Sequence, residues 1–212
     1  MKPKRYEPLD LAGAKTYPLA SRPSIVGIAD AARPWKAGGT FKAYLETLPN
    51  HLAVRSLRAV ADAIHDAHRH GKPVLLGLGA HVIKVGLSPV VIDLVERGLV
   101  TAVALNGACA VHDFELATVG CTSEDVEAQL SEGDFGMAEE TGRVLNEAAI
   151  DGARRGVGFG RALGDRLLAM RPPHLAHSLL GTCARLDVPC TVHVAIGTDI
   201  VHVHPRCDGA AV

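Results

Sequence analysis

The chain has 212 residues, a formal net charge of -1 and 48% hydrophobic residues, which suits one globular domain with a substantial core. The near-neutral charge and the aromatic content of 4% argue against nucleic acid as a partner, because the chain encodes neither a basic surface nor a base-stacking platform. No apolar run approaches the roughly 18 residues that a membrane span needs, so no membrane partner is expected.

Residues 1–50 are predicted to form an extended N-terminal arm, because they are rich in proline and show no sustained hydrophobic period. A strand near Ser24–Ile28 and a short helix near Phe41–Leu48 are expected within it. Its apolar side chains predict packing onto the domain or onto a neighbouring subunit, and hence a homo-oligomer. Met1–Pro8 lacks the apolar stretch of a secretory signal, and the five cysteines form no CxxC pair, so we expect a cytoplasmic protein with free thiols.

Residues 51–212 are predicted to form a nucleotide-binding α/β domain. A helix from His51 to Gly71 precedes the branched apolar run Pro73–Gly79, which indicates a buried strand. Ser88-Pro89 predicts the start of the next helix, with the serine as N-cap and the proline at the first helical position. The second strand is expected at Leu99–Leu105. A strand, a crossover helix and a second strand form a βαβ unit, whose right-handed crossover makes the two strands parallel.

The middle of the chain is predicted to be helical, and a third parallel strand is expected at Pro189–Ile196. The periodic segments predict five helices: Ala110–Val119, Ser123–Leu130, Ala138–Arg155, Phe159–Met170 and His174–Leu186. The predicted fold is therefore a Rossmann-like parallel sheet with flanking helices.

Ligands of open parallel sheets bind beyond the carboxyl ends of the strands, which selects the loops 77–86, 106–113 and 197–204. Small residues such as Gly77 and Gly79 let backbone N–H groups approach a phosphate or a ribose. The third glycine of the usual dinucleotide fingerprint is replaced by Val82, so a tight turn explains this pair of glycines equally well.

Three side chains in the first two loops are candidates for chemistry. Lys84 lies in an apolar, glycine-rich loop, where a desolvated amine would act as a nucleophile or pair with phosphate. The alternative is a lysine whose stem covers apolar surface with its head in water. His112 and Asp113 suit hydrogen bonds to ribose hydroxyls or a proton-transfer pair. The alternative is that Asp113 is an ordinary acidic residue near a helix start and that His112 is a surface residue.

His202 and His204 suggest a different class of site. On an extended segment, two histidines separated by one residue present both rings on one face, as in many metal sites. No further ligand motif such as HExxH or CxxC accompanies them.

The segments Gly77–Gly86 and Asn106–Phe114 together resemble the deoxyhypusine synthase family. Its members carry a glycine- and serine-rich loop after one strand and a Thr-Gly-Ala/Ala-Gly-Gly…(His or Glu)-Asp-Leu segment after the next. Asn106–Glu115 is also similar to the NAD-dependent ornithine cyclodeaminase domain of bifunctional arginine-degrading proteins, which has a Gly-Asn-Ala-x-Ala-x-His-Asp-(Ile/Met)-Glu stretch here. Both resemblances extend over Pro73–Asp199, and only the two early loops are specific.

The resemblance implies NAD as cofactor and subunit association near its site. It also implies NAD chemistry in which an amine is oxidised to an imine that is transferred or hydrolysed, with the amine meeting Asp113 or Asp199. Asp199 lies near, but not clearly on, a family aspartate. The positions that match the family's NAD loops are Ala80, His81, Val85, Asn106, Gly107, Ala108 and His112.

The chain departs from the synthases in one important segment. Their catalytic lysine lies in a Gly-Glu-Ala-x-Ser-Trp-Gly-Lys stretch that is absent here, and the family has more strands beyond Cys207–Val212. The chain is therefore expected to be either truncated at its C-terminus or a shorter, diverged relative. Lys84 occupies a place where synthases carry a small polar residue, which makes it a candidate for a relocated amine nucleophile.

We therefore predict a cytoplasmic, NAD-binding, deoxyhypusine-synthase-like protein that acts on a small amine or amino acid as a transferase or a cyclodeaminase-like enzyme. The predicted catalytic residues are Lys84, His112, Asp113 and Asp199. Two alternatives stay open: a metal-dependent hydrolase built on His202 and His204, and a non-catalytic nucleotide-binding module.

Overall fold

The computed structural model describes residues 6, 8–130 and 133–212. Its internal contacts divide the chain into two compact units, Met1–Ala61 and Asp62–Val212. The boundary between the two units falls inside the helix α2 (Leu52–Arg69). Within the described residues, no helix is both long enough and apolar enough to cross a membrane.

The N-terminal unit consists of short elements joined by extended chain. Two 3₁₀ turns, η1 (Leu19–Ser21) and η2 (Ile28–Asp30), precede the helix α1 (Phe41–Thr47), which confirms the predicted helix. The side chain of Thr40 caps α1 by accepting a hydrogen bond from the Ala43 N–H at 3.2 Å. The strand predicted near Ser24–Ile28 is wrong, because the segment pairs with no strand in the described part of the chain and Ile28 begins a 3₁₀ turn.

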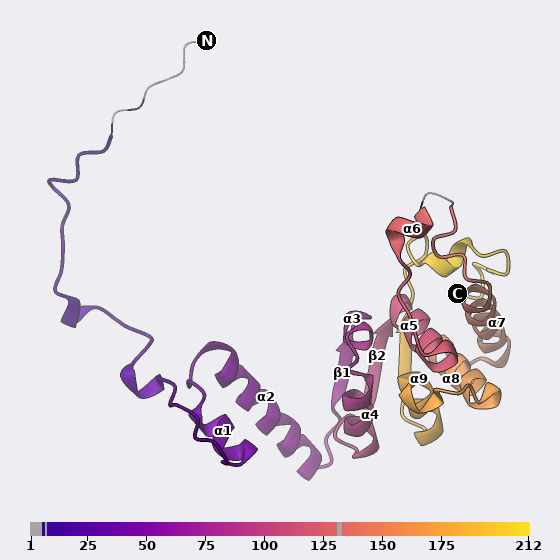
Figure 1. Ribbon diagram of the computed structural model, residues 1–212, viewed down its shortest axis with the longest axis horizontal. Coiled ribbons are helices and arrows are strands. Elements are labelled where there is room, and N and C mark those ends of the chain that lie inside the picture. Colours follow the sequence, from indigo (N-terminus) through magenta and orange to yellow (C-terminus); the bar gives the residue numbers. More distant parts are fainter. Residues whose placement is uncertain (1–5, 7, 131–132) are drawn as a thin grey trace. The chain divides into compact units, whose positions relative to one another are not determined.

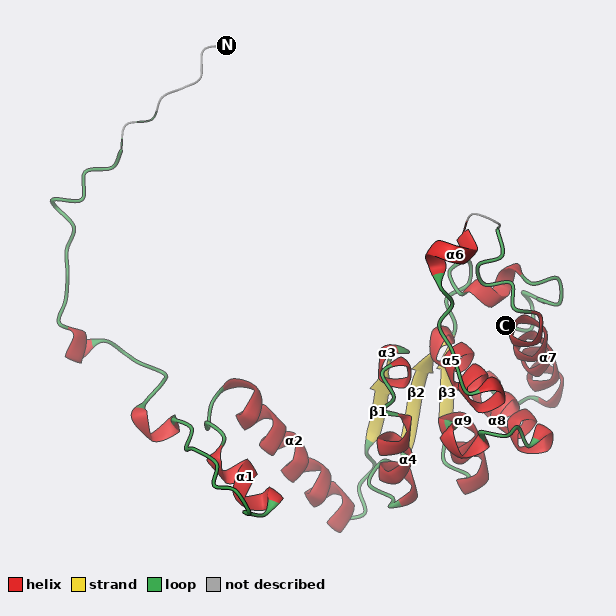
Figure 2. Ribbon diagram, viewed as in Figure 1, coloured by secondary structure: helices red, strands yellow, loops and turns green. Residues whose placement is uncertain are grey.

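Three short parallel strands form the sheet of the C-terminal unit. They are β1 (Leu75–Leu78), β2 (Ala102–Asn106) and β3 (Cys190–His193), with β2 in the middle, as the yellow arrows of Figure 2 show. Leu78 pairs with Leu105, and Asn106 pairs with His193. The predicted parallel α/β architecture is confirmed, with each strand shorter than its apolar run.

The sheet buries one of its faces. Val103 and Leu105 point into the core together with the partly buried Leu76, Leu78 and Val192, whereas the alternate positions of the outer strands are exposed. Five helices contribute several buried residues each to this core: α4 (Ser88–Glu96), α5 (Gly107–Val119), α7 (Glu139–Arg155), α8 (Phe159–Met170) and α9 (Leu179–Leu186). Figure 1 shows α5 beginning where β2 ends.

The remaining elements connect or flank these helices. They are α3 (His81–Lys84), α6 (Val126–Leu130), η3 (Leu175–His177) and η4 (Ile200–Val203). The predicted helix over 174–186 is divided at Ser178, whose hydroxyl caps α9 by accepting from the Gly181 N–H at 2.8 Å. The expectation for Ser88 is wrong, because Leu87 is the N-cap of α4 and Ser88 is its first residue.

Candidate functional site

A cavity of about 560 Å³ lies beyond the carboxyl ends of β2 and β3. Residues from the loops after all three strands line it, together with α5 and the segment between α5 and α7. Such a position is typical of ligand sites in parallel α/β sheets. The polar residues of the lining are Lys84, Asn106, His112, Glu115, Ser123, Glu124, Thr141, His193, Thr198 and Asp199.

The first two loops lie next to each other, as predicted. The register pairs Leu78 with Leu105, and a Cβ built on Gly79 would lie 3.9 Å from Nδ2 of Asn106. From the first loop, however, only Lys84 lines the cavity. The other predicted cofactor residues of that loop lie outside the lining: Gly77, Gly79, Ala80, His81 and Val85.

Lys84 is the last residue of α3 and is exposed. The desolvated environment expected for a nucleophilic amine is therefore absent. Its position on the cavity wall suits the other expected role, in which an ammonium group pairs with an anionic ligand.

The second loop forms the N-terminus of α5. Oδ1 of Asn106 accepts a hydrogen bond from the Cys109 N–H at 3.0 Å and so caps the helix. Ala108 lines the cavity, whereas Gly107 is buried. A Cβ on Gly107 would collide with the carboxylate of Asp199, so the absence of a side chain lets the loop after β3 approach the start of α5.

Asp199 reaches the cavity from the loop after β3. Its Oδ2 accepts a hydrogen bond from the Ala195 N–H at 3.0 Å, which fixes the carboxylate. Because this carboxylate lies against Gly107, it also faces the positive end of the α5 dipole. His193 and Thr198 accompany it in the lining.

Asp113 is separated from the predicted site. Its carboxylate is fully buried and accepts hydrogen bonds from the Ser178 hydroxyl at 2.6 Å, the Leu179 N–H at 2.7 Å and the Leu180 N–H at 3.2 Å. Burial raises the pKa of Asp113 to about 6, although all three hydrogen bonds lower it. The expected catalytic role is not supported by this position; the residue ties α5 to the N-terminus of α9.

His112 is the centre of a hydrogen-bonded group on the cavity wall. Its Nδ1 lies 2.6 Å from Oγ1 of Thr122, and the Thr122 hydroxyl donates to Oε2 of Glu115. The hydroxyl of Thr141 donates to the other Glu115 oxygen, Oε1, at 3.0 Å. His112 and Glu115 are each only 16% exposed. These partners of His112 were not predicted from the sequence, although Glu115 follows His112 at the i,i+3 spacing that places two side chains on one helix face.

The electrostatic surroundings favour the neutral form of His112. Burial lowers the pKa of His112, Glu115 opposes this shift, and the positive charge of Lys84 adds to it. The cavity around the ring is acidic. Among the described residues of its lining, the basic side chain of Lys84 is outnumbered by the carboxylates of Glu115, Glu124 and Asp199. Such a lining attracts a cationic group.

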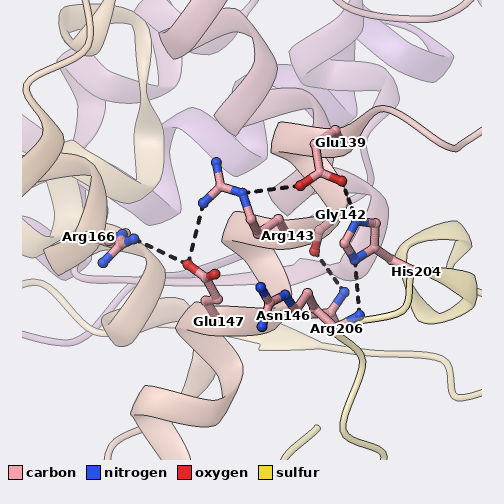
Figure 3. A network of polar contacts seen from close by, with 8 residues as sticks. All are labelled: Glu139, Gly142, Arg143, Asn146, Glu147, Arg166, His204 and Arg206. Carbon is pink, nitrogen blue, oxygen red and sulfur yellow. Dashed lines mark hydrogen bonds and ion pairs between the residues drawn. The ribbon is translucent and has the colours of Figure 1, made fainter.

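The geometry expected for a metal site at His202 and His204 is wrong, because the segment forms the 3₁₀ helix η4 and is not extended. Both ring nitrogens of His204 already have partners in a polar network (Figure 3). Nε2 lies 3.1 Å from Oε2 of Glu139, and Nδ1 accepts a hydrogen bond from the Arg206 N–H at 3.2 Å. Nδ1 of His202 is buried without a hydrogen-bond partner among the described residues.

The network around His204 continues along α7. Arg143 pairs with Glu139 at 3.3 Å and with Glu147 at 3.5 Å, and Arg166 of α8 reaches Glu147 at 3.3 Å (Figure 3). Within the described residues, no group of three or more His, Cys, Asp or Glu side chains is arranged to hold a metal ion. The network therefore joins the C-terminal segment to α7 and α8.

No protein-family model matches the chain. Over 102 residues the chain is 34% identical to a phosphoglucosamine mutase of Nitrosospira multiformis, an alignment that covers 47% of this chain and 22% of that protein. A solved structure of ArgZ, an arginine dihydrolase from the ornithine-ammonia cycle in cyanobacteria, is similar with a TM-score of 0.44 and 20% identity, over 76% of this chain and 20% of that chain. The chain thus spans about a fifth of each of these proteins.

Proposed function

We propose that the cavity binds a nucleotide of the NAD type and that a small amine or amino acid is oxidised beside it. The observation that carries this proposal is that loops following all three parallel strands contribute to one cavity at the carboxyl edge of the sheet. Nucleotides bind at this edge in α/β proteins. The volume of about 560 Å³ lies within the range of about 300–1,000 Å³ that is usual for small-molecule sites.

The lining offers hydrogen-bonding and charged partners for both the phosphate groups and the riboses of such a nucleotide. Phosphate groups fit Lys84 and the first turn of α5 at Ala108, where backbone N–H groups lack partners within the helix. The space beside Gly107 is already taken by Asp199. Carboxylates such as Asp199 and Glu124 suit ribose hydroxyls, which donate hydrogen bonds to an acidic residue in many dinucleotide sites.

When bound, NAD⁺ would supply the acceptor for a hydride from the carbon that carries the amine. The acidic lining draws the protonated amine into the cavity. Neutral His112 takes a proton from the ammonium group, so that the nitrogen lone pair becomes available as the C–H bond breaks. With NAD⁺ bound, the products would be an iminium group and NADH. Water or a second amine then attacks the imine carbon.

Calorimetric titration of the full chain with NAD⁺ tests the proposal. The wild-type protein is expected to bind one NAD⁺. Because His112 is also proposed to accept a hydrogen bond from a ribose hydroxyl, His112→Ala is expected to bind NAD⁺ more weakly by about tenfold, a loss of about 1.4 kcal/mol. His65→Ala removes an exposed histidine on α2 and serves as the matched control. The absence of any NAD⁺ binding by the wild type would overturn the proposal. Binding without NADH formation from ornithine or polyamines would instead favour a non-catalytic module.

A further inference from the structure

The hydroxyl of Thr122 decides which nitrogen of His112 carries a proton. A threonine hydroxyl has one hydrogen to donate, and the geometry gives this hydrogen to Oε2 of Glu115. The Thr122 oxygen must therefore accept a hydrogen from Nδ1 of His112, which lies 2.6 Å away. In the neutral ring, Nε2 is then the nitrogen with the free lone pair.

Glu115 is itself held in place from the other side. The Thr141 hydroxyl of α7 donates to Oε1 at 3.0 Å, so both carboxylate oxygens accept a hydrogen from a threonine. Glu115 is largely buried, and its Oε2 lies 3.8 Å from Nδ1 of His112. An ionised carboxylate accepts hydrogen bonds and does not donate them. The direction of the chain of hydrogen bonds is therefore fixed from His112 through Thr122 to Glu115.

Nε2 of His112 lies at the free end of this series of hydrogen bonds and can accept a hydrogen bond from a ligand. Among the residues that the structure describes, no hydrogen bond engages Nε2, and His112 lines the cavity. The charged groups that act on the ring are Glu115 on α5 itself and Lys84 on α3. Neither removes the lone pair from Nε2.

We propose that Thr122 and Glu115, anchored by Thr141, are positioning residues that hold His112 as the Nδ1–H tautomer and present Nε2 as the hydrogen acceptor for an O–H or N–H group of the ligand. The tautomer follows from the protein alone. The use of Nε2 by a ligand rests on the proposed function, in which the donor is an ammonium group or a ribose hydroxyl.

Nitrogen-15 NMR of the histidine rings in the ligand-free chain tests the tautomer. The His112 signals are identified by their loss in His112→Gln. We expect Nδ1 of the wild type to give the shift of a protonated nitrogen and Nε2 that of an unprotonated one near neutral pH. Thr122→Val, which has no hydroxyl, should abolish this bias, and Thr122→Ser should restore it. A wild-type His112 protonated on Nε2, or an unchanged tautomer in Thr122→Val, would overturn the proposal.

Titration with NAD⁺ and with ornithine tests the second half. Thr122→Val should weaken binding of the ligand that reaches Nε2 by about fivefold to tenfold, as expected for one lost hydrogen bond, and Thr122→Ser should remain close to the wild type. A lost tautomer with unchanged affinity for a ligand that does bind would overturn the role of Nε2. Binding of neither ligand by the wild type would count against the proposed function and leave the tautomer result standing.

Discussion

Replacement of Asp113 by alanine should lower the stability of the protein by about 3 kcal/mol. Its carboxylate accepts three buried hydrogen bonds, two of them from backbone N–H groups at the start of α9. Hydrogen bonds to a charged group contribute about 1.5–3 kcal/mol each. Removal of the carboxylate also recovers its burial cost, which offsets part of this sum. The pKa rises from 3.8 to about 6 because burial outweighs the three hydrogen bonds, and this net shift corresponds to about 3 kcal/mol against the ionised form in the folded protein.

The same carboxylate predicts a pH dependence of defined sign. Since the pKa of Asp113 is raised in the folded state, the folded protein binds more protons than the unfolded chain between about pH 4 and pH 6. The contribution of this group to stability is therefore most favourable below pH 4, falls as the pH rises through 6, and is constant above it. The difference between wild type and Asp113→Asn should isolate this slope, because the other titrating groups are shared.

Urea unfolding followed by circular dichroism measures both effects. Asp93→Ala is the matched control, because this exposed acid pairs with Arg97 on the surface of α4 and should change stability by less than about 1 kcal/mol. Asp113→Ala should still bind NAD⁺ with wild-type affinity at a temperature at which it is folded. A stable Asp113→Ala variant that has lost NAD⁺ binding would contradict the purely structural role of Asp113.

Three further substitutions have defined outcomes. Lys84→Gln should weaken NAD⁺ binding by about tenfold and reduce its salt dependence, because the proposed charge-assisted contact to phosphate would be lost. Lys72→Gln replaces an exposed lysine outside the cavity and should match the wild type in calorimetry. Gly107→Ala should cost about 1–3 kcal/mol in urea unfolding and displace Asp199, whereas Gly158→Ala, where nothing lies near the added methyl group, should change stability little. Gly142→Ala places a methyl group against the His204 ring, so it should also lose about 1–3 kcal/mol while NAD⁺ affinity stays unchanged.

The central architecture could be predicted because its signals are local. The branched apolar runs that became β1, β2 and β3 alternate with helical segments, and right-handed crossovers then make the strands parallel. The adjacency of the first two loops follows from that topology alone. The strand expected near Ser24–Ile28 does not form. A strand needs a pairing partner, and local β propensity does not supply one.

The site could be predicted only where a loop position sufficed. Lys84, Asn106, Ala108, His112 and Asp199 do line one cavity. The roles of neighbouring residues on α5 could not be separated, because successive side chains of a helix point about 100° apart. His112 thus faces the cavity while the next residue is buried against α9.

Long-range partners carry no signal in a single sequence. Thr141 bonds to Glu115, which lies 26 positions away in the sequence. Ser178 bonds to the carboxylate of Asp113, which lies 65 positions away. The pairing of His204 with Glu139 also spans 65 positions. His204, predicted as a metal ligand, therefore connects the C-terminal segment to α7.

The most direct test fills the cavity and asks whether NAD⁺ is excluded. Ala108→Phe introduces a ring on the cavity wall at the start of α5, and Ala153→Phe introduces the same ring at an exposed position of α7. Calorimetry should show NAD⁺ binding to the wild type and to Ala153→Phe, with affinity for Ala108→Phe reduced by more than about tenfold. Undiminished binding to a folded Ala108→Phe variant would contradict the assignment of this cavity as the nucleotide site.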